Sequence, residues 1–231
     1  MRGSVKPLSV HICIATERHD WPHTIEDEEG SLAQAIGKAG LAMLSELQKI
    51  DRVVLSNVSL PLPNRTNAYT GYEVYILYNA WCKLENVQKE DAEHVLLQYA
   101  LSKPVKPASY TATPMGFRAV VLVCSHMRRD ARCGKTAPIL LEALEEGLRE
   151  RDMFYDKDEG SEDGKVLVTT VSHIGGHRYA GNVLVYRKTD TGTVETLWLG
   201  RIMPNDIPWV IEYTVLQGRV KRSAVRGGVQ W

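Results

Sequence analysis

The order of apolar segments along the chain occurs twice, once on each side of a proline-rich stretch. That stretch, "SKPVKPASYTATPMG" at residues 102–116, has three prolines and many small residues, which interrupt helical and strand periodicity. Before it, an apolar run predicts a strand at residues 8–15, and "GSLAQAIGKAGLAMLSELQKI" predicts a helix capped by Ser31. The patterns "RVVLSNVSL" and "YEVYILYNA" predict two further strands, and "EDAEHVLLQYAL" predicts a second helix.

The second half nearly repeats this order. "FRAVVLVCS" predicts a strand, and "TAPILLEALEEGLRERD" predicts a helix with Pro138 in its first turn. Three strands follow, in "KVLVTTVS", "GNVLVYR" and "VETLWLG", and then a closing helix in "NDIPWVIEYTVLQGRV". A β-α-β unit followed by more strands and a helix is the thioredoxin-like pattern. The sequence therefore predicts an α/β protein with a thioredoxin-like C-terminal module, preceded by a second α/β module of the same kind.

The predicted modules have boundaries at the proline-rich stretch. A chain of 231 residues is long enough for two small domains with separate cores. We expect the N-terminal module at residues 1–103 and a linker at 104–117. The C-terminal module then spans residues 118–220 and carries the candidate site, and residues 221–231 form a tail.

Charge and cysteine content exclude several classes of protein. Acidic and basic residues balance at 28 each, which favours neither a nucleic-acid-binding protein nor a membrane-surface protein. No segment approaches the roughly 18–20 apolar residues of a membrane span. The opening "MRGSVKPLSVHICIAT" leads almost directly into a strand, so we expect no signal or transit peptide. Four cysteines are too few for a disulfide scaffold, which favours a reducing compartment: the cytoplasm, with mitochondria as the alternative.

Two cysteines and two histidines follow neighbouring strands of the C-terminal module. Cys124 lies at the end of its strand and Cys133 just before the next helix, whereas His173 and His177 follow the second strand. These two strands run side by side in a thioredoxin-like module, so both loops open at the same edge of the sheet. The two glycines between the histidines allow a tight turn that brings both imidazoles to one side. Together the four side chains make a complete four-ligand metal set.

The remaining cysteines and histidines have simpler interpretations. Cys13 and Cys82 have no ligand-like neighbours in the sequence, so we expect them to be small buried apolar side chains. His126 lies in the cysteine loop and could be a ligand, but its partners match less well. The Cys-x2-Cys spacing typical of redox-active thioredoxins is absent.

Three motifs, "DWPHTIEDEEGSLAQA", "CSHMRRDARCGKTAPIL" and "SHIGGHRYAGNVLVY", resemble in this order the sucrase/ferredoxin-like family, which includes fungal actin patches distal and altered inheritance of mitochondria proteins. The resemblance implies a thioredoxin-like ferredoxin fold that holds a [2Fe–2S] cluster through two cysteines and two histidines. Cys124 and Cys133 match the cysteine pair of the family, and His173 and His177 match its histidine pair. It also implies an electron carrier in cellular redox and thiol chemistry, whose partner protein the sequence does not identify, rather than an enzyme with its own substrate.

The residues around this ligand set favour electron transfer. Replacing two thiolates by neutral imidazoles raises the potential of a [2Fe–2S] cluster, as in Rieske centres. A ligand histidine keeps one ring nitrogen that can exchange a proton, so we expect electron transfer to be coupled to proton transfer. Basic residues also crowd the two loops, where they would either favour the reduced cluster or form a solvated basic face: Arg128, Arg129, Arg132, Lys135 and Arg178.

Two other chemistries fit the same residues. Two cysteines and two histidines suit a structural zinc ion equally well. Alternatively, Cys124 and Cys133 could act as the disulfide pair of a thiol oxidoreductase. An iron–sulfur protein is red-brown and the other two are colourless, so colour separates the three hypotheses.

The last residues bear on how a cluster would be inserted. The segment "RVKRSAVRGGVQW" is basic and finishes with Trp231. An apolar, a polar and an aromatic residue at a chain end resemble the tripeptide by which the cytosolic iron–sulfur assembly machinery recognises its clients. We therefore expect Trp231 to contribute to recognition by that machinery, which also favours the cytoplasm. The simpler interpretation is a frayed tail.

Overall fold

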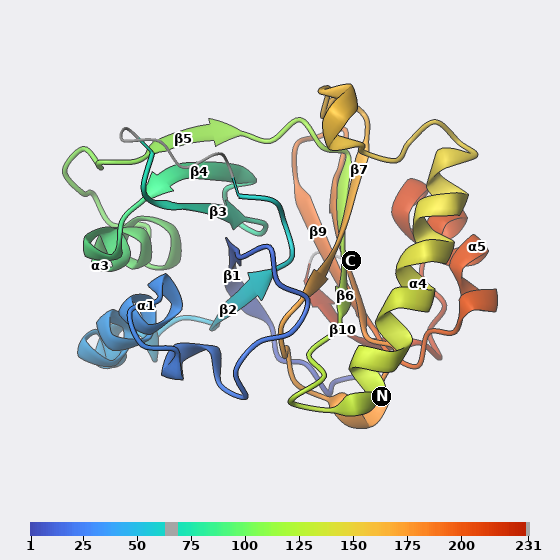
Figure 1. Ribbon diagram of the computed structural model, residues 1–231, viewed down its shortest axis with the longest axis horizontal. Coiled ribbons are helices and arrows are strands. Elements are labelled where there is room, and N and C mark those ends of the chain that lie inside the picture. The colour runs from blue at the N-terminus through green and yellow to red at the C-terminus, as the bar shows by residue number, and fades with distance from the viewer. Residues whose placement is uncertain (63–68, 230–231) are drawn as a thin grey trace. The chain divides into compact units, whose positions relative to one another are not determined.

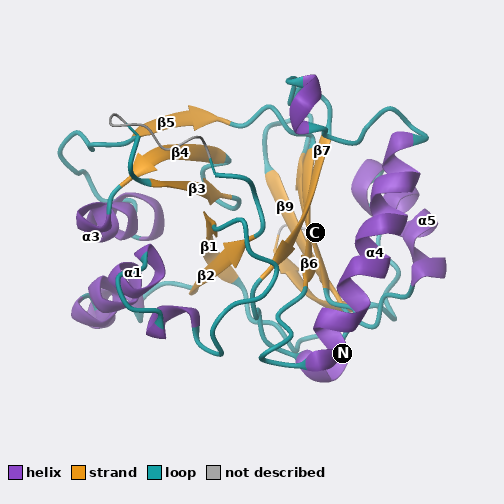
Figure 2. Ribbon diagram, in the orientation of Figure 1, coloured by secondary structure: helices purple, strands orange, loops and turns teal. Residues whose placement is uncertain are grey.

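The computed structural model describes residues 1–62 and 69–229, and the chain divides into two compact units. The N-terminal unit consists of Leu8–Met115, and the C-terminal unit consists of Gly116–Trp231 together with Met1–Pro7. Each unit is a sheet with its helices packed on one face (Figures 1 and 2). The predicted α/β class is confirmed.

Within its described residues, the N-terminal unit has five strands in the order β2-β1-β3-β4-β5. β1 and β2 are parallel, and the other neighbours are antiparallel. Helices follow β1 and β4, as predicted, and Ser31 caps α1 by accepting a hydrogen bond from the backbone N–H of Gln34 at 3.0 Å. The elements are β1 (Leu8–Ala15), α1 (Leu32–Ala42), α2 (Leu44–Leu47), β2 (Arg52–Val58), β3 (Tyr72–Ile76), β4 (Cys82–Val87), α3 (Ala92–Val95) with a π-helical turn (Leu96–Ala100), and β5 (Thr111–Pro114).

The C-terminal unit has its five strands in the corresponding order, β7-β6-β8-β9-β10. β6 and β7 are parallel, and the other neighbours are antiparallel. The elements are β6 (Ala119–Cys124), α4 (Ala131–Arg149), β7 (Val166–Val171), β8 (Val183–Lys188), β9 (Val194–Leu199), α5 (Ile207–Trp209) with a π-helical turn (Val210–Leu216), and β10 (Val225–Val229).

Each unit buries its helices against alternate residues of its own sheet. In α4, Leu140, Leu144 and Leu148 recur every four residues, so they lie on one helix face. All three are buried in a core that also contains Val121 and Val123 of β6. Burial of these apolar side chains away from water is the main contribution to the stability of the unit.

The two units share their topology in detail. After the first strand, the backbone N–H of Thr16 donates to the carbonyl of Val58 at 3.0 Å, and the N–H of Ser125 donates to the carbonyl of Val171 at 3.2 Å. Both units also have a β-α-β start, two further antiparallel strands and a closing helix with a π-helical turn. This is the predicted thioredoxin-like order, and it is present in both units.

The structure differs from the predicted boundaries in three places. Residues 104–117, predicted to be a linker, include β5, which pairs with β4 in the N-terminal sheet. Residues 221–231, predicted to be a tail, include β10, which pairs with β9. Residues 1–7, predicted within the first module, group with the C-terminal unit. The sequence "TATP" and the sequence "VRGGV" lack a β-branched apolar run, so the strands are formed by their long-range partners.

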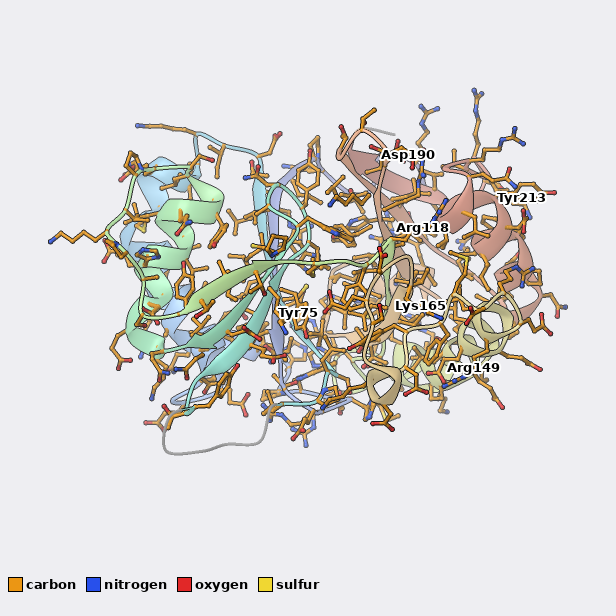
Figure 3. The ribbon with its side chains drawn as sticks, turned by 90° about the horizontal axis from the view of Figure 1, so that it is seen from above. Tyr75, Arg118, Arg149, Lys165, Asp190 and Tyr213 are labelled. Carbon is orange, nitrogen blue, oxygen red and sulfur yellow. The ribbon has the colours of Figure 1, made fainter. Side chains whose placement is uncertain are left out.

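The pairing register of the C-terminal unit shows at which end of its strands the candidate site lies. This end of the strands is the edge of the sheet where the candidate ligands gather. Cys124 pairs with Val171, so the loops after β6 and β7 leave the sheet at the same edge. Val183 pairs with Val123, so the chain returns into β8 there. The opposite edge carries Arg118, Lys165 and Asp190, which are labelled in Figure 3. In residues 1–62 and 69–229, no helix has the length and apolar character needed to cross a membrane.

Candidate metal centre

Cys124 and Cys133 are held by a strand end and by the first turn of a helix. Cys124 is the last residue of β6, and its backbone N–H donates to the carbonyl of Asn182 at 3.1 Å. α4 begins at Ala131, before the start near residue 136 that Pro138 indicated, because Asp130 caps the helix by accepting from the N–H of Arg132 at 2.9 Å. Cys133 therefore lies within the first turn of the helix, near the positive end of the helix dipole.

The two thiol groups contact each other directly. Both cysteines are buried and neither forms a disulfide. Hydrogen bonding from Cys133 lowers the pKa of Cys124 well below its ordinary value, and further hydrogen bonds from the His173 ring and the backbone N–H of His126 act in the same direction. The same thiol–thiol bond, together with burial, raises the pKa of Cys133. The arrangement stabilises a thiolate at Cys124.

The two histidines lie on a tight turn between β7 and β8. Gly175 and Gly176 have φ angles of 86° and 73°, in the left-handed region that glycine adopts readily. The chain folds back there, and the ring centroids of His173 and His177 are 5.6 Å apart with their planes 31° from parallel. The His173 ring reaches Cys124, whereas His177 is exposed at the start of a short 3-10 turn. The structure thus brings His173 to the cysteine pair and sets His177 beside His173.

His126 orients the histidine turn. Its side chain is 1% exposed, and its Nδ1 accepts a hydrogen bond from the backbone N–H of His173 at 3.0 Å. The two rings meet edge to face with centroids 6.4 Å apart. The ring of His126 therefore links the loop after β6 to the loop after β7.

The donor set suits a two-iron cluster in its chemistry. Each iron of a [2Fe–2S] cluster takes two protein ligands, and thiolate and imidazole are the ligands it uses. Cys124 with Cys133, and His173 beside His177, provide two such pairs at one edge. Within residues 1–62 and 69–229, no three His, Cys, Asp or Glu side chains are grouped so that they could hold a single metal ion.

The basic residues named above surround this edge. Arg128, Arg132, Lys135 and Arg178 are exposed, and Arg129 is half-buried. The guanidinium of Arg132 forms an ion pair with Asp130 at 2.7 Å, and this hydrogen bonding lowers the pKa of Asp130 to about 2. The Arg178 guanidinium lies over the Tyr179 ring, 4.8 Å from its centroid.

Sequence reasoning missed Arg226 and Asn182. Arg226 lies on β10 and is 2% exposed, and its Nη1 donates to the carbonyl of Gly175 at 3.1 Å and to Oδ1 of Asn182 at 2.7 Å. Nothing in "VRGGV" distinguishes this arginine from the basic residues around it. The candidate recognition residue Trp231 lies outside the described residues.

The N-terminal cysteines are placed as the sequence predicted. Cys13 is fully buried in β1, and burial raises its pKa well above the ordinary value. Cys82 is buried at the start of β4, and burial raises its pKa to about 11. Both thiols are therefore held in the protonated, apolar form.

Comparisons with known proteins agree with the family resemblance of the motifs. "Altered inheritance of mitochondria protein 32" of Debaryomyces hansenii is 39% identical over 110 residues, which are 48% of this chain and 36% of that protein. "Actin patches distal protein 1" of Saccharomyces cerevisiae is 36% identical over 99 residues, 43% of this chain and 30% of that protein. The chain therefore spans only about a third of the length of these two relatives.

A solved structure and a family profile complete the comparison. A thioredoxin-like [2Fe–2S] ferredoxin from Aquifex aeolicus aligns over 50% of this chain and 96% of its own, at 15% identity and a TM-score of 0.36. The fold assignment rests on the strand order. The profile described as sucrase/ferredoxin-like matches residues 1–227. The chain belongs to the sucrase/ferredoxin-like family.

Proposed function

We propose that the protein transfers electrons through a [2Fe–2S] cluster held by Cys124, Cys133, His173 and His177. The observation that carries the proposal is the position of the Cys124 thiol, which contacts both the Cys133 thiol and the His173 ring. Thiol and imidazole groups that are brought together at one edge, on elements whose topology fixes them, form a preorganised ligand set. A bound cluster would supply one-electron chemistry.

The surrounding residues would favour the thiolate, the form in which a cysteine binds iron. The backbone N–H of His126 stabilises thiolate charge at Cys124, and Cys133 lies in the first turn of α4, near the positive end of the helix dipole. Hydrogen bonds to the sulfur atoms and the exposure of His177 are both factors that set the potential of such a cluster. Two neutral imidazoles make the oxidised cluster less negative, so an added electron is less strongly repelled.

The direct test is an anaerobic metal and sulfide analysis combined with a visible spectrum. The proposal expects about two irons and two acid-labile sulfides per chain, with a red-brown colour. One zinc ion per chain in a colourless protein would instead support the structural zinc site. Colourless, metal-free protein from cells grown with ample iron would contradict both metal hypotheses.

A second candidate is a thiol oxidoreductase that uses Cys124 and Cys133. The lowered pKa of Cys124 and its direct contact with a second thiol favour it, because a thiolate beside a resolving thiol is the usual arrangement for disulfide exchange. The test is a mass measurement after oxidation of the metal-free protein. A reversible loss of two hydrogens confined to these cysteines, in protein that binds no metal in the cell, would favour this candidate.

Proton coupling is part of the proposed electron transfer. A histidine that binds iron through one ring nitrogen can hold or release a proton at the other, and oxidised iron acidifies that proton more than reduced iron does. The potential should then fall as the pH rises through the pKa of the oxidised state. A redox titration from neutral to alkaline pH measures this, and a flat potential over the range would leave a simple electron carrier.

The partner, the compartment and the role of Trp231 stay predictions. We propose a redox partner protein in the cytoplasm, with this chain as a carrier that exchanges electrons and protons with thiols, quinones or flavins. Deleting Trp231 should lower cluster content in the cell and leave reconstitution in vitro unchanged. Equal iron content in the two proteins would contradict recognition through this residue.

A further inference from the structure

We propose that Arg226 is a positioning residue that holds the His173–His177 turn against the strand carrying Cys124. The proposal rests on the proposed function only where it treats this turn as a source of metal ligands. The contacts themselves are properties of the protein chain. The proposal gives a function to a strand that the sequence indicated to be a tail.

Arg226 is buried and its donors are directed at three separate segments. Its side chain is 2% exposed, and a guanidinium is buried at acceptable cost only when its N–H groups are bonded. Nη1 donates to the carbonyl of Gly175 at 3.1 Å and to Oδ1 of Asn182 at 2.7 Å, while Nε donates to Oγ of Ser4 at 3.3 Å. One side chain on β10 thus connects the turn, the start of β8 and the N-terminal segment.

Asn182 extends this connection to the cysteine strand. Its Nδ2 donates to the carbonyl of Gly176 at 3.3 Å, and its backbone carbonyl accepts from the N–H of Cys124 at 3.1 Å. The carbonyls of both glycines are therefore held, one by Arg226 and one by Asn182. Two adjacent glycines have more conformational freedom than any other pair, so these external bonds select one conformation of the turn.

The space around the guanidinium fits arginine. A Cβ atom at Gly176 would collide with Nη2 of Arg226, and one at Gly200 would lie 2.8 Å from its Cδ. The ring of Tyr179 lies 5.3 Å from the guanidinium carbon, within the range of a cation–π contact. Lysine has a single ammonium and no planar fork, so it cannot reproduce the two directed Nη1 bonds with the same geometry.

Arg187 provides a matched control within the same sheet. It lies on β8 near the opposite edge, its side chain is 15% exposed, and its Nη2 forms an ion pair with Glu195 at 3.0 Å. Like Arg226, it lies against a glycine, because a Cβ at Gly218 would collide with its guanidinium. Replacing Arg187 tests the effect of losing a largely buried arginine without touching the turn.

The experiment measures backbone hydrogen exchange in peptides covering residues 172–182 of the metal-free, full-length protein. Arg226→Gln should speed exchange in these peptides about tenfold, the effect expected for the loss of one or two net hydrogen bonds. Arg226→Lys should give a smaller increase, and Arg187→Gln should leave these peptides unchanged. Unchanged exchange in Arg226→Gln, or an equal increase in Arg187→Gln, would overturn the proposal.

A second variant keeps the test decisive if Arg226→Gln fails to fold. Asn182→Ala removes the other half of the connection, so it should speed exchange in the same peptides and not in those of the opposite edge. The iron content and visible spectrum of Arg226→Gln are then compared with those of the wild type, where we expect iron to be lost to a chelator about tenfold faster. If the wild type binds no iron, the proposed function fails, and the exchange measurement alone decides the role of Arg226.

Discussion

The two units share one strand order, yet within residues 1–62 and 69–229 only the C-terminal unit carries cysteines where its first strand, first helix and second strand meet; the N-terminal unit has His19 there, 3.1 Å from Oγ of Ser59. The last residue of the first strand is Cys124 in one unit and Ala15 in the other. Three residues after the cap of its first helix, the C-terminal unit has Cys133 and the N-terminal unit has Gln34. The topology therefore provides the position, and the residues placed there decide whether it can bind a metal.

The loop after the first strand shows how the N-terminal unit fills the corresponding edge. In the C-terminal unit this loop, residues 125–130, is short and polar. In the N-terminal unit it is longer, residues 16–31, and it buries Trp21 completely, with the indole N–H donating to Oγ1 of Thr16 at 2.9 Å. An apolar ring in this loop contributes to the core of its unit but supplies no ligand.

The fifth strands differ as well. β5 of the N-terminal unit has mostly exposed side chains, whereas β10 of the C-terminal unit directs Arg226 into the histidine turn. The same architectural position thus closes a sheet in one unit and supports a candidate ligand loop in the other.

The largest expected effect comes from the cysteines, because they differ most between the units. Cys124→Ser or Cys133→Ser should abolish iron binding, since each removes a thiolate that would hold iron. Cys13→Ser and Cys82→Ser are matched controls in the N-terminal unit and should keep full iron content. Iron and sulfide per chain, with the visible spectrum, measure the outcome. Full iron content in Cys124→Ser would show that the ligand set is misidentified.

The order of elements could be predicted because it depends on local signals. Leu140, Leu144 and Leu148 mark the buried face of a helix, and Ser31 marks a helix start. The start of α4 was misplaced because Pro138 resembles a first-turn proline, although it lies inside the helix and Asp130 is the cap. The four candidate ligands stood out by their spacing, and their ligation stays a prediction.

Arg226 could not be predicted because its partners are distant in the sequence. Asn182 and Gly175 are 44 and 51 positions away, and Ser4 is 222 positions away. No local pattern records which of several arginines near a chain end will be buried. The same reason applies to β5 and β10, whose strand character comes from their partners rather than from their own residues.

Acid should destabilise the N-terminal unit through His11, a histidine buried within its first strand at a position where the first strand of the C-terminal unit has valine. His11 is fully buried and its Nε2 contacts Oγ of Ser56 at 3.0 Å; Val120 is its counterpart in β6. Burial, with a smaller contribution from Arg52, lowers the pKa of His11 to about 3. Since the unfolded chain binds this proton near pH 6.5, the stabilisation is complete above that pH and is lost as the pH falls towards 3.

The expected size is about 1.4 kcal/mol per pH unit, or roughly 3 kcal/mol between pH 6.5 and 4.5. Urea unfolding at several pH values measures it in the wild type and in His11→Gln. Other titrating groups are common to both proteins, so the difference between the two curves isolates His11. Parallel curves would show that His11 is not held neutral by the fold.

The histidine turn should set the potential of the cluster. His173→Cys or His177→Cys adds a negative charge to the ligand set, so the cluster should persist with a potential lower by roughly 125–350 mV, half the difference between bis-histidine and all-cysteine clusters. A redox titration followed by the visible spectrum measures this. Leu60→Cys, at the N-terminal counterpart of His173, should leave the potential unchanged. A potential that does not move in either histidine variant would remove both imidazoles from the ligand set.

The smallest expected effect separates two costs of replacing a glycine by alanine: backbone strain, and collision of the added methyl group with Arg226. Gly30, Gly175 and Gly176 all have positive φ angles, and a Cβ at Gly30 or Gly175 would meet no atom within 4 Å. Gly30→Ala and Gly175→Ala should therefore each lower the free energy of unfolding by about 1 kcal/mol, through strain alone. Gly176→Ala should cost about 1 kcal/mol more, because its methyl group would displace the guanidinium of Arg226.

A second arginine substitution completes this test. In protein that already carries Arg226→Gln, the guanidinium is absent, so Gly176→Ala should cost no more than Gly175→Ala. Such non-additivity is expected only for residues in direct contact, and urea unfolding of the single and double variants measures it. If the cost of Gly176→Ala stayed the same with and without Arg226, the turn would be restrained by its backbone alone, as the chain is at Gly30, where a Cβ meets no atom within 4 Å.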